Sequence, residues 1–368
     1  VERQSGIVRA AGRHHRFDHH QIQEVMYSGM PLGLSEEYHS LVAQALAEKE
    51  GFEGARPEDL PGETSVSLAG HWLRGGMADQ ALPHLAPALD HLERAYRGEA
   101  ALEILERALS ADGILHGSQR AEMLLRMAKL HGVRGELRPE RSALDEAIRI
   151  ASVGPDPHLL ARARIALGVH LRYSTDRPGA REQFEMALAF AREKKEPTLE
   201  WTAAEALSVL LRQLGQPDQA RETLQTALDV ALATGDRRGV ARVTGRMGLV
   251  HFGEGRIEEA IRHHETHLAL SREDADLEGE GMAIMDLGIA FLELGDGEHA
   301  RVRFERSLAL AREVGDRLSE VRATGNLALA FVLLGRFADA CSWSEASLSL
   351  AQEIGSRGQI SLATVSVA

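Results

Sequence analysis

The sequence predicts an all-α protein built as a solenoid of repeated helix pairs. The main observation is a spacing of 40 residues, at which Gly255, Gly295 and Gly335 coincide when the sequence is shifted by one period. Self-similarity at such a period is typical of repeat architectures, in which each repeat packs mainly on its neighbours. Hydrophobic residues make up 44% of the chain but aromatic residues only 4%. This composition favours closely packed helices rich in Ala and Leu.

Net charge, cysteine content and the length of apolar runs limit the kinds of binding partner and the cellular compartment that we expect. The chain has 42 Lys and Arg against 55 Asp and Glu, a net charge of -13, which argues against nucleic-acid binding because phosphates need a basic surface. The single cysteine, Cys341, excludes an internal disulfide framework and fits a reducing compartment. The longest apolar run, 327–334, is far shorter than the ~18 residues that span a bilayer. We therefore expect a cytoplasmic protein without membrane binding.

Residues 1–50 do not follow the repeat and are predicted to form a short helical region. Ile22, Val25 and Met26 have the spacing i, i+3, i+4 and would lie on one helix face. Pro31 then interrupts the pattern.

A second helix is predicted over about residues 35–49, with Ser35 as its N-cap. Its expected buried stripe consists of Leu41, Val42, Ala45 and Leu46.

Residues 51–64 are rich in Gly, Pro and acidic residues and are predicted to be a linker. Residues 65–118 are predicted to hold degenerate repeats. One helix is expected over 65–74, and its partner is expected from 78 to about 89, made irregular by two prolines. Residues 99–109 are interpreted as the second helix of another degenerate repeat.

Regular repeats are predicted over residues 119–355, with a glycine at the turn between the two helices of every repeat except the one that has Thr175. An alanine follows on the second helix, where a small side chain lets the helices approach closely. Gly235 and Gly315 suit the left-handed residue after a helix end, and Asp236 and Asp316 suit the next N-cap. The turn residues are Gly135, Thr175, Gly215, Gly255, Gly295 and Gly335, and the alanines are Ala180, Ala220, Ala260, Ala300 and Ala340.

This pattern resembles the tetratricopeptide repeat in a 40-residue form. The resemblance implies a right-handed superhelix of about seven or eight repeats. Residues 356–368 have the apolar content of a further first helix and are interpreted as a truncated or capping helix.

The segment from Phe17 to Tyr27 reads F-x-H-x-x-I-Q-E-x-x-Y. It is similar to the end of the winged-helix region in bacterial STAND-type signalling ATPases, where tetratricopeptide repeats follow. The resemblance implies that residues 1–50 are a remnant of that region and that the chain is a piece of a longer protein. The phosphate-binding motif G-x-x-x-x-G-K-[ST] is absent from the sequence, so we assign no nucleotide or other cofactor to it.

The resemblance also implies that the first helix of each repeat lines a concave face. Three rows of residues would point into it, and their arginines would make a positive groove in an acidic protein. Arginine forks suit carboxylates and phosphates, so one hypothesis is an acidic peptide held mainly by Arg162, Arg242, Arg246 and Arg322. The three rows are Ala166, Ala206, Arg246, Asp286 and Asn326; Arg162, Thr202, Arg242, Met282 and Arg322; and Arg172, Arg212, Phe252, Leu292 and Val332.

The alternative is that these arginines pair with neighbouring glutamates, such as Glu205, Glu278 and Glu320, and only keep the face solvated. The sequence alone leaves both interpretations open.

Two further groups of residues were considered as sites. His263 and His267 have the i, i+4 spacing that can place two imidazoles on one metal, but no third ligand is indicated, so we predict no metal site and assign His267 to a gap between helices. Cys341 is predicted to be a packed small side chain. The tryptophans Trp72, Trp201 and Trp343 and the N-terminal histidines His14, His15, His19 and His20 are predicted to be structural.

The sequence therefore favours a protein-interaction and sensor scaffold that binds a partner or peptide and regulates an upstream STAND-like ATPase. The alternative is a stand-alone adaptor that binds a peptide on its groove. We expect no enzyme, because no convergent catalytic arrangement is found.

Overall fold

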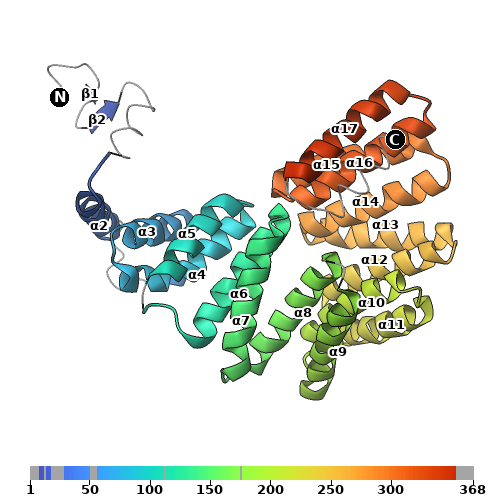
Figure 1. Cartoon of the computed structure of the whole chain (residues 1–368), viewed down its shortest axis with the longest axis horizontal. Coiled ribbons are helices and arrows are strands. Elements are labelled where there is room, and N and C mark those ends of the chain that lie inside the picture. Colours follow the sequence, from blue (N-terminus) through green and yellow to red (C-terminus); the bar gives the residue numbers. More distant parts are fainter. Residues whose placement is uncertain are drawn as a thin grey trace. The chain divides into compact units, whose positions relative to one another are not determined.

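The structure is a computed structural model of the 368-residue chain. The described part of the chain contains 16 α-helices and divides into two compact units, Val1–Leu115 (unit 1) and His116–Ala368 (unit 2) (Figure 1). The described residues are 8–11, 14–17, 29–49, 56–111, 113–174 and 176–353.

Unit 1 begins with a short β-hairpin. Strand β1 (Val8–Ala11) pairs antiparallel with β2 (His14–Phe17), with Val8 opposite Phe17. The sequence analysis predicted only helical structure in this region, so the hairpin is a difference from that expectation. Residues 18–28, which carry the predicted first helix and most of the F-x-H motif, lie outside the described residues.

Helix α2 (Leu32–Lys49) starts earlier than predicted. Its first turn follows Pro31, whose carbonyl accepts a hydrogen bond from the backbone N of Ser35 at 3.0 Å. Ser35 therefore lies inside the helix and is not its N-cap.

The buried face of α2 also differs from the prediction. Leu41 is 58% exposed, and Ala45 is exposed as well, whereas His39 and Ala43 are buried. His39 can be buried because its Nδ1 lies 2.7 Å from Nδ1 of His71 across the contact with the next helix. A pattern of apolar residues cannot reveal a helix face that contains a hydrogen-bonded histidine.

The other elements of unit 1 are η1 (Pro57–Asp59), α3 (Gly62–Arg74), α4 (Ala78–Arg94) and α5 (Gly98–Ser110). Helix α3 includes residues that were assigned to the linker, and α4 continues past both prolines. Its buried residues extend to Leu92, so packing holds the helix despite the lost backbone donors. Helix α4 already pairs with α3, and no first helix of a new pair lies between α4 and α5. Helix α5 is therefore not the second helix of a pair, contrary to the prediction.

Unit 2 consists of consecutive helix pairs that follow the predicted period. In each pair, the two helices are antiparallel neighbours joined by a short turn (Figure 1). The six pairs of the described residues are α6 (Gly117–Arg134) with α7 (Leu137–Val153), α8 (Pro157–Tyr173) with α9 (Arg177–Lys194), α10 (Pro197–Gln213) with α11 (Pro217–Thr234), α12 (Arg237–Gly253) with α13 (Ile257–Glu273), α14 (Leu277–Glu293) with α15 (Gly297–Val314), and α16 (Arg317–Leu333) with α17 (Phe337–Glu353). With α3 and α4 they make seven pairs, within the predicted number.

The turns inside the pairs have the predicted chemistry. The turn glycines adopt the left-handed conformation, with φ of 75° at Gly135 and 77° at Gly255, which an L side chain adopts only with strain. Gly235 and Gly315 also have positive φ, and the carboxylates of Asp236 and Asp316 accept hydrogen bonds from the following helix N-termini. Thr175, the exception in the pattern, lies outside the described residues.

In the pairs α8–α9, α12–α13 and α14–α15, a glycine on the first helix faces a large ring on the second. The rings of Phe184 and Phe304 lie against Gly168 and Gly288, where a Cβ would come within 2.5 Å of the ring. The predicted alanines of the second helices are all buried: Ala180, Ala220, Ala260, Ala300 and Ala340. This complementarity explains how a core with few aromatic residues is filled.

The first helices of successive pairs form the inner side of the curve. Among the described residues of unit 2, extended contacts between like helices of neighbouring pairs occur for α6, α8, α10, α12, α14 and α16 but for no second helices. Helix α16 also contacts α6, so the curve nearly closes on itself (Figure 1). The concave face is therefore lined mainly by first helices, as predicted.

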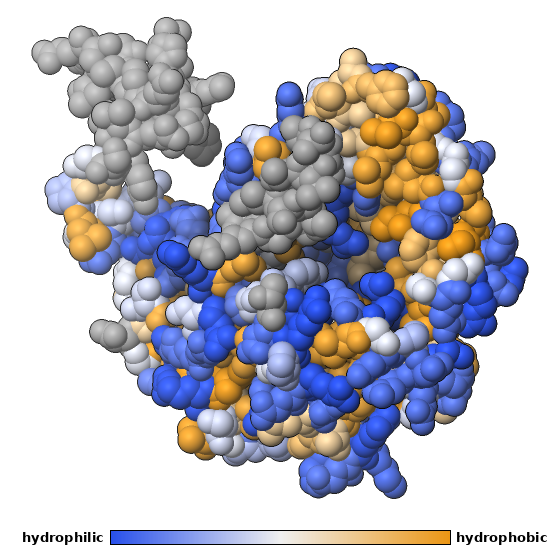
Figure 2. Space-filling view, turned by 45° about the vertical axis from the view of Figure 1, so that its right-hand side comes forward, coloured by the Kyte–Doolittle hydropathy of each residue, from blue (hydrophilic) through white to orange (hydrophobic). Residues whose placement is uncertain are grey.

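The surface of unit 2 is mixed in polarity (Figure 2). Figure 2 shows apolar side chains gathered over the C-terminal helices, where Leu329, Val332 and Phe337 are exposed. No helix in the described ranges is long and apolar enough to cross a membrane.

We expect Gly248→Ala to destabilise unit 2 by about 1–3 kcal/mol, because its Cβ would lie 2.6 Å from Cε1 of the buried His264. The control is Gly253→Ala in the same helix, whose Cβ would meet nothing within 4 Å. It should be neutral or stabilise by up to about 1 kcal/mol. Urea unfolding of both variants measures the difference, and equal destabilisation would contradict the close approach of α12 and α13.

Candidate functional site

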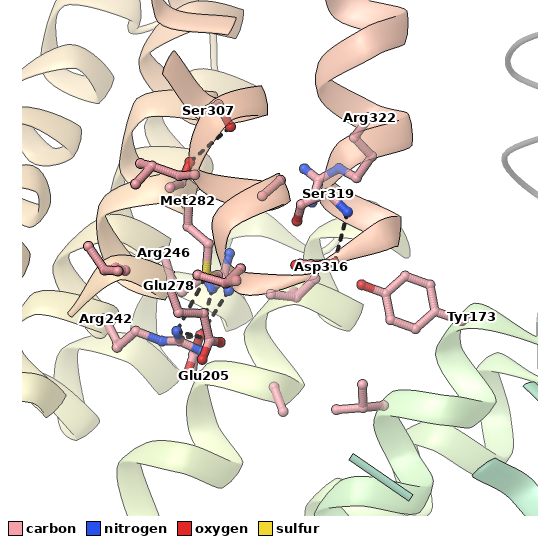
Figure 3. Close-up of a pocket in the computed structure, with 18 of the residues that line it drawn as sticks. Tyr173, Glu205, Arg242, Arg246, Glu278, Met282, Ser307, Asp316, Ser319 and Arg322 are labelled. Carbon is pink, nitrogen blue, oxygen red and sulfur yellow. Dashed lines mark hydrogen bonds and ion pairs between the residues drawn. The ribbon is translucent and has the colours of Figure 1, made fainter. Parts of the chain in front are cut away.

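A cavity of about 340 Å³ lies on the concave face of unit 2. First helices from α8 to α16 contribute to it, and so does the second helix α15 (Figure 3). A cavity of this volume falls in the range of small-ligand sites. Residues of the predicted rows that line it are Arg172, Thr202, Ala206, Arg242, Arg246, Met282 and Arg322.

Other residues of the predicted rows do not line the cavity. Arg162 is exposed and pairs with Glu122, the two shortest contacts being 2.8 and 3.0 Å. Asn326 donates from its amide nitrogen to the sulfur of Met285 at 3.3 Å. Also outside the lining are Ala166, Arg212, Phe252, Asp286, Leu292 and Val332.

A network of ion pairs around the buried Glu205 forms one wall of the cavity (Figure 3). Nε of Arg246 donates to Oε1 of Glu205 at 2.9 Å, and Nε of Arg242 lies 3.4 Å from the same oxygen. Arg242 also donates from Nη1 to Glu278 at 3.2 Å. Helices α10, α12 and α14 are thus joined by alternating charges.

Glu205 occupies an unusual position in the repeat. One period before it stands Ile165, one period after it Gly245, and two periods after it Met285. None of these residues is charged, and Ile165 and Met285 are buried. Burial raises the pKa of the Glu205 carboxyl, but Arg242 and Arg246 outweigh this effect and hold the pKa at about 2. Glu205 in turn raises the pKa of Arg242. For Arg242 and Arg246, the expected pairing with glutamates is therefore present.

Arg322 does not follow the pairing hypothesis. Its expected partner Glu320 instead accepts hydrogen bonds from Arg312 at 2.9 Å and Arg317 at 2.8 Å. Neither Arg172 nor Arg322 forms an ion pair with a carboxylate in the part of the chain that the structure describes. The sequence analysis grouped all the inner-face arginines together, but the structure separates paired from unpaired ones.

The lining residues Arg172, Arg246 and Arg322 act electrostatically on Arg212, which lies outside the lining. Burial lowers the pKa of Arg212, and although Asp286 opposes this, the charges of Arg246, Arg172 and Arg322 lower it further. The Nε atoms of Arg172 and Arg212 are buried and have no hydrogen-bond partner among the described residues. Like charges gathered around unsatisfied donors produce a site of positive potential.

Tyr173 lies at the mouth of this site, and sequence reasoning missed it. The guanidinium carbon of Arg172 stands 4.5 Å from the centroid of the Tyr173 ring. Burial raises the pKa of the phenol, but Arg172, Arg322 and Arg246 lower it more strongly. The hydroxyl points across the cavity towards the start of α16, where Asp316 and Ser319 lie (Figure 3).

The sequence analysis also missed the apolar part of the lining that comes from a second helix. Leu310, Ala311 and Val314 of α15 line the cavity beside Ile165 and Val169 of α8. The predicted rows held only first-helix positions, so a contribution from α15 could not be found from the repeat pattern.

The histidines of α13 have structural roles. His267 is 2% exposed and fills the gap above Gly245, as predicted, and His264 is fully buried against Gly248. His263 stacks on His251 with ring centroids 4.9 Å apart. The described residues contain no group of three or more metal-ligating side chains that could hold a metal ion.

The cysteine prediction was wrong, and the tryptophan prediction is confirmed. Cys341 is exposed, because it points away from the helix face that carries the buried Ala340. Trp72 and Trp201 are buried, and Trp343 packs against the last core cluster. Trp201 donates from Nε1 to Asp236 at 2.7 Å, which ties it to the following repeat.

We expect the stability of unit 2 to fall as the pH drops from about 6.5 to about 4. Burial lowers the pKa of His267 from its usual 6.5 to about 4, so the unfolded chain takes up a proton in this window and the folded chain does not. The contribution of His267 to the free energy of unfolding is fully present above pH 6.5. It falls by up to ~3 kcal/mol as the pH reaches about 4.

His267→Ala, which introduces the residue found at Ala187 and Ala227, should reduce this pH dependence. Urea unfolding at about pH 7.5 and about pH 5 measures it. A variant with the same pH dependence as the wild type would contradict the assignment.

Comparisons with known proteins agree with the repeat geometry. Residues 201–273 and 279–353 match the tetratricopeptide repeat family. No curated protein matches the chain. Among solved structures, a Rap protein complexed with competence and sporulation factor superposes with a TM-score of 0.58 at 13% identity, covering 83% of this chain and 96% of that one.

Two other solved structures are similar in fold. NprR in complex with its cognate peptide NprX has a TM-score of 0.53 at 16% identity, over 77% of this chain and 81% of that one. The STAND protein PH0952 from Pyrococcus horikoshii, which has a tetratricopeptide repeat sensor, has a TM-score of 0.51 at 12% identity. That alignment covers 98% of this chain but spans only 52% of the STAND protein.

At these identities the solved structures establish the fold alone. The period, the helix pairs and the family match agree over the C-terminal part of unit 2. Residues 201–273 and 279–353 are therefore tetratricopeptide repeats, and the helix pairs of the chain form a tetratricopeptide-like solenoid.

Proposed function

We propose that unit 2 binds a short acidic peptide, free or part of a partner protein, in the cavity on its concave face. The observation that carries this proposal is that Arg172 and Arg322 line the cavity without a carboxylate partner among the described residues, in a protein of net charge -13. The role is one of binding, and no catalytic role is proposed.

The position and form of the cavity support a peptide as the ligand. The cavity combines the cationic side with an apolar wall from Ile165, Val169 and Val314, and mixed surfaces of this kind suit a peptide with both acidic and apolar groups. NprR was solved with its cognate peptide, and a Rap regulator of plasmid pLS20 with the Phr* peptide. Peptides are therefore ligands that this fold accommodates in other proteins.

A second candidate function is that of the sensor region of a STAND-type ATPase. It is favoured by the alignment of nearly the whole chain with half of the STAND protein PH0952 and by the motif from Phe17 to Tyr27. In this proposal, peptide binding on the concave face would change how an upstream ATPase is held. The gene sequence before Val1 decides between the two candidates, since a phosphate-binding loop there favours the sensor and a nearby start codon favours the adaptor.

We expect Ala206→Trp to abolish peptide binding, because the indole would fill the cavity that Ala206 lines while the substitution removes no side chain of the ion network. Affinity selection of a random hexapeptide library by the full chain, read by mass spectrometry, measures binding. The matched control is Ala309→Trp on the exposed side of α15, which should retain binding. Thermal unfolding of both variants verifies that they are folded. Equal selection by the wild type and a folded Ala206→Trp would contradict the proposed site.

A further inference from the structure

The charges around the cavity do not balance. The charged side chains that line the cavity are the four arginines Arg172, Arg242, Arg246 and Arg322 and the three carboxylates Glu205, Glu278 and Asp316. Outside the lining, Arg212 and Asp286 act on each other. Burial lowers the pKa of the neighbouring His264 and His267, so both imidazoles are neutral near pH 7. One positive charge is therefore left without a partner among these groups.

The surplus lies at Arg172 and Arg322. Glu205 and Glu278 are engaged by Arg242 and Arg246 in the ion network. Asp316 accepts a hydrogen bond from the backbone N of Ser319 at 2.9 Å and so serves the N-terminus of α16. Asp286 lies deeper, with Oδ2 at 3.9 Å from Nδ1 of His264, and acts on Arg212.

One of these two arginines, Arg172, is also poorly solvated. Nε of Arg172 is buried without a hydrogen-bond partner among the described residues, and a buried donor left unsatisfied is unfavourable. The ring of Tyr173 stacks on the guanidinium of Arg172 and holds it in place, and the phenol adds a hydroxyl donor at the same mouth. The arrangement is preorganised for an acceptor that carries negative charge.

We propose that Arg172 and Arg322, with the hydroxyl of Tyr173, bind one carboxylate of the peptide. This inference rests on the proposed peptide-binding function and names the group that the site recognises. A single surplus charge matches a carboxylate, which carries one negative charge, better than a phosphate, which carries nearly two at neutral pH.

The apolar wall lies beside the charged site. Val169 precedes Arg172 by one turn of α8, and Val314 of α15 lines the same cavity. The carboxylate therefore belongs to a residue whose carbon atoms lie on this wall. Such a carboxylate has two possible sources. One is the C-terminus of an apolar residue, and the other is the side chain of Glu or Asp.

The test uses four pools of random hexapeptides and the full chain. The first pool has free C-termini and no acidic side chain. The second has amidated C-termini and one Glu or Asp, the third is amidated and has no acid, and the fourth is amidated and has one phosphoserine. Retention of each pool is measured by affinity selection and mass spectrometry at fixed ionic strength.

We expect the wild type to retain one of the carboxylate pools about tenfold better than the neutral pool. A factor of this size is the gain in affinity that one charge-assisted hydrogen bond provides. The first pool identifies a C-terminal carboxylate and the second a side-chain carboxylate. Arg322→Gln and Arg172→Gln should reduce this preference to near that of the neutral pool. Arg322 is exposed and makes no ion pair in the described ranges, so its substitution leaves the fold intact.

The matched control is Arg162→Gln. Arg162 belongs to the same predicted row as Arg322, but Glu122 already neutralises it and it does not line the cavity. This variant should retain the wild-type preference.

The outcomes separate the two proposals. If the wild type retains neutral and carboxylate pools equally, but Ala206→Trp loses both, peptide binding stands and the carboxylate site is overturned. Stronger retention of the phosphoserine pool, or a preference unaffected by Arg322→Gln, also overturns it. If the wild type retains no pool, the proposed function fails and the carboxylate site fails with it.

Discussion

The structure of unit 2 depends on the close approach of the two helices in each pair. In three of the pairs, a glycine on the first helix faces a large ring on the second, as Gly168 faces Phe184 and Gly288 faces Phe304. This contact fixes the spacing within a pair, and the left-handed turn glycines fix where the second helix starts. Stacking of such pairs then places the first helices on the inside of the curve. The cavity is a consequence of that curvature, since residues from α8 and α16 line the same space.

The repeat pattern predicted the scaffold well because the features of the scaffold are determined by residues that are close together in the sequence. Turn glycines, helix caps at Asp236 and Asp316, and buried alanines each depend on a few neighbouring residues, and all recur with the period. Prediction failed where the period does not apply. The hairpin of β1 and β2, the earlier start of α2 and the lone helix α5 all lie in unit 1, where no second copy was available for comparison.

The site was predicted only in part, for a different reason. Periodicity placed Arg242, Arg246 and Arg322 on the inner face, but it could not show which arginine meets which carboxylate. That depends on contacts between side chains of different repeats, such as Arg246 with Glu205 at 41 residues' separation. Tyr173 and the residues of α15 were missed because they reach the cavity through the curvature of the solenoid, which no single repeat encodes.

Glu205 limits the modularity that repeat proteins usually have. In an ordinary solenoid, one repeat can be removed or duplicated because each interface resembles the next. Here a carboxylate stands in a core position, and its charge is stabilised by two arginines of the following repeat. Deleting the pair α12 and α13 would leave that carboxylate buried without a counter-charge. The repeats from α10 to α14 are therefore coupled by these charges. Removing or duplicating one of them alone would leave the charges unbalanced, so their number cannot change by one repeat at a time.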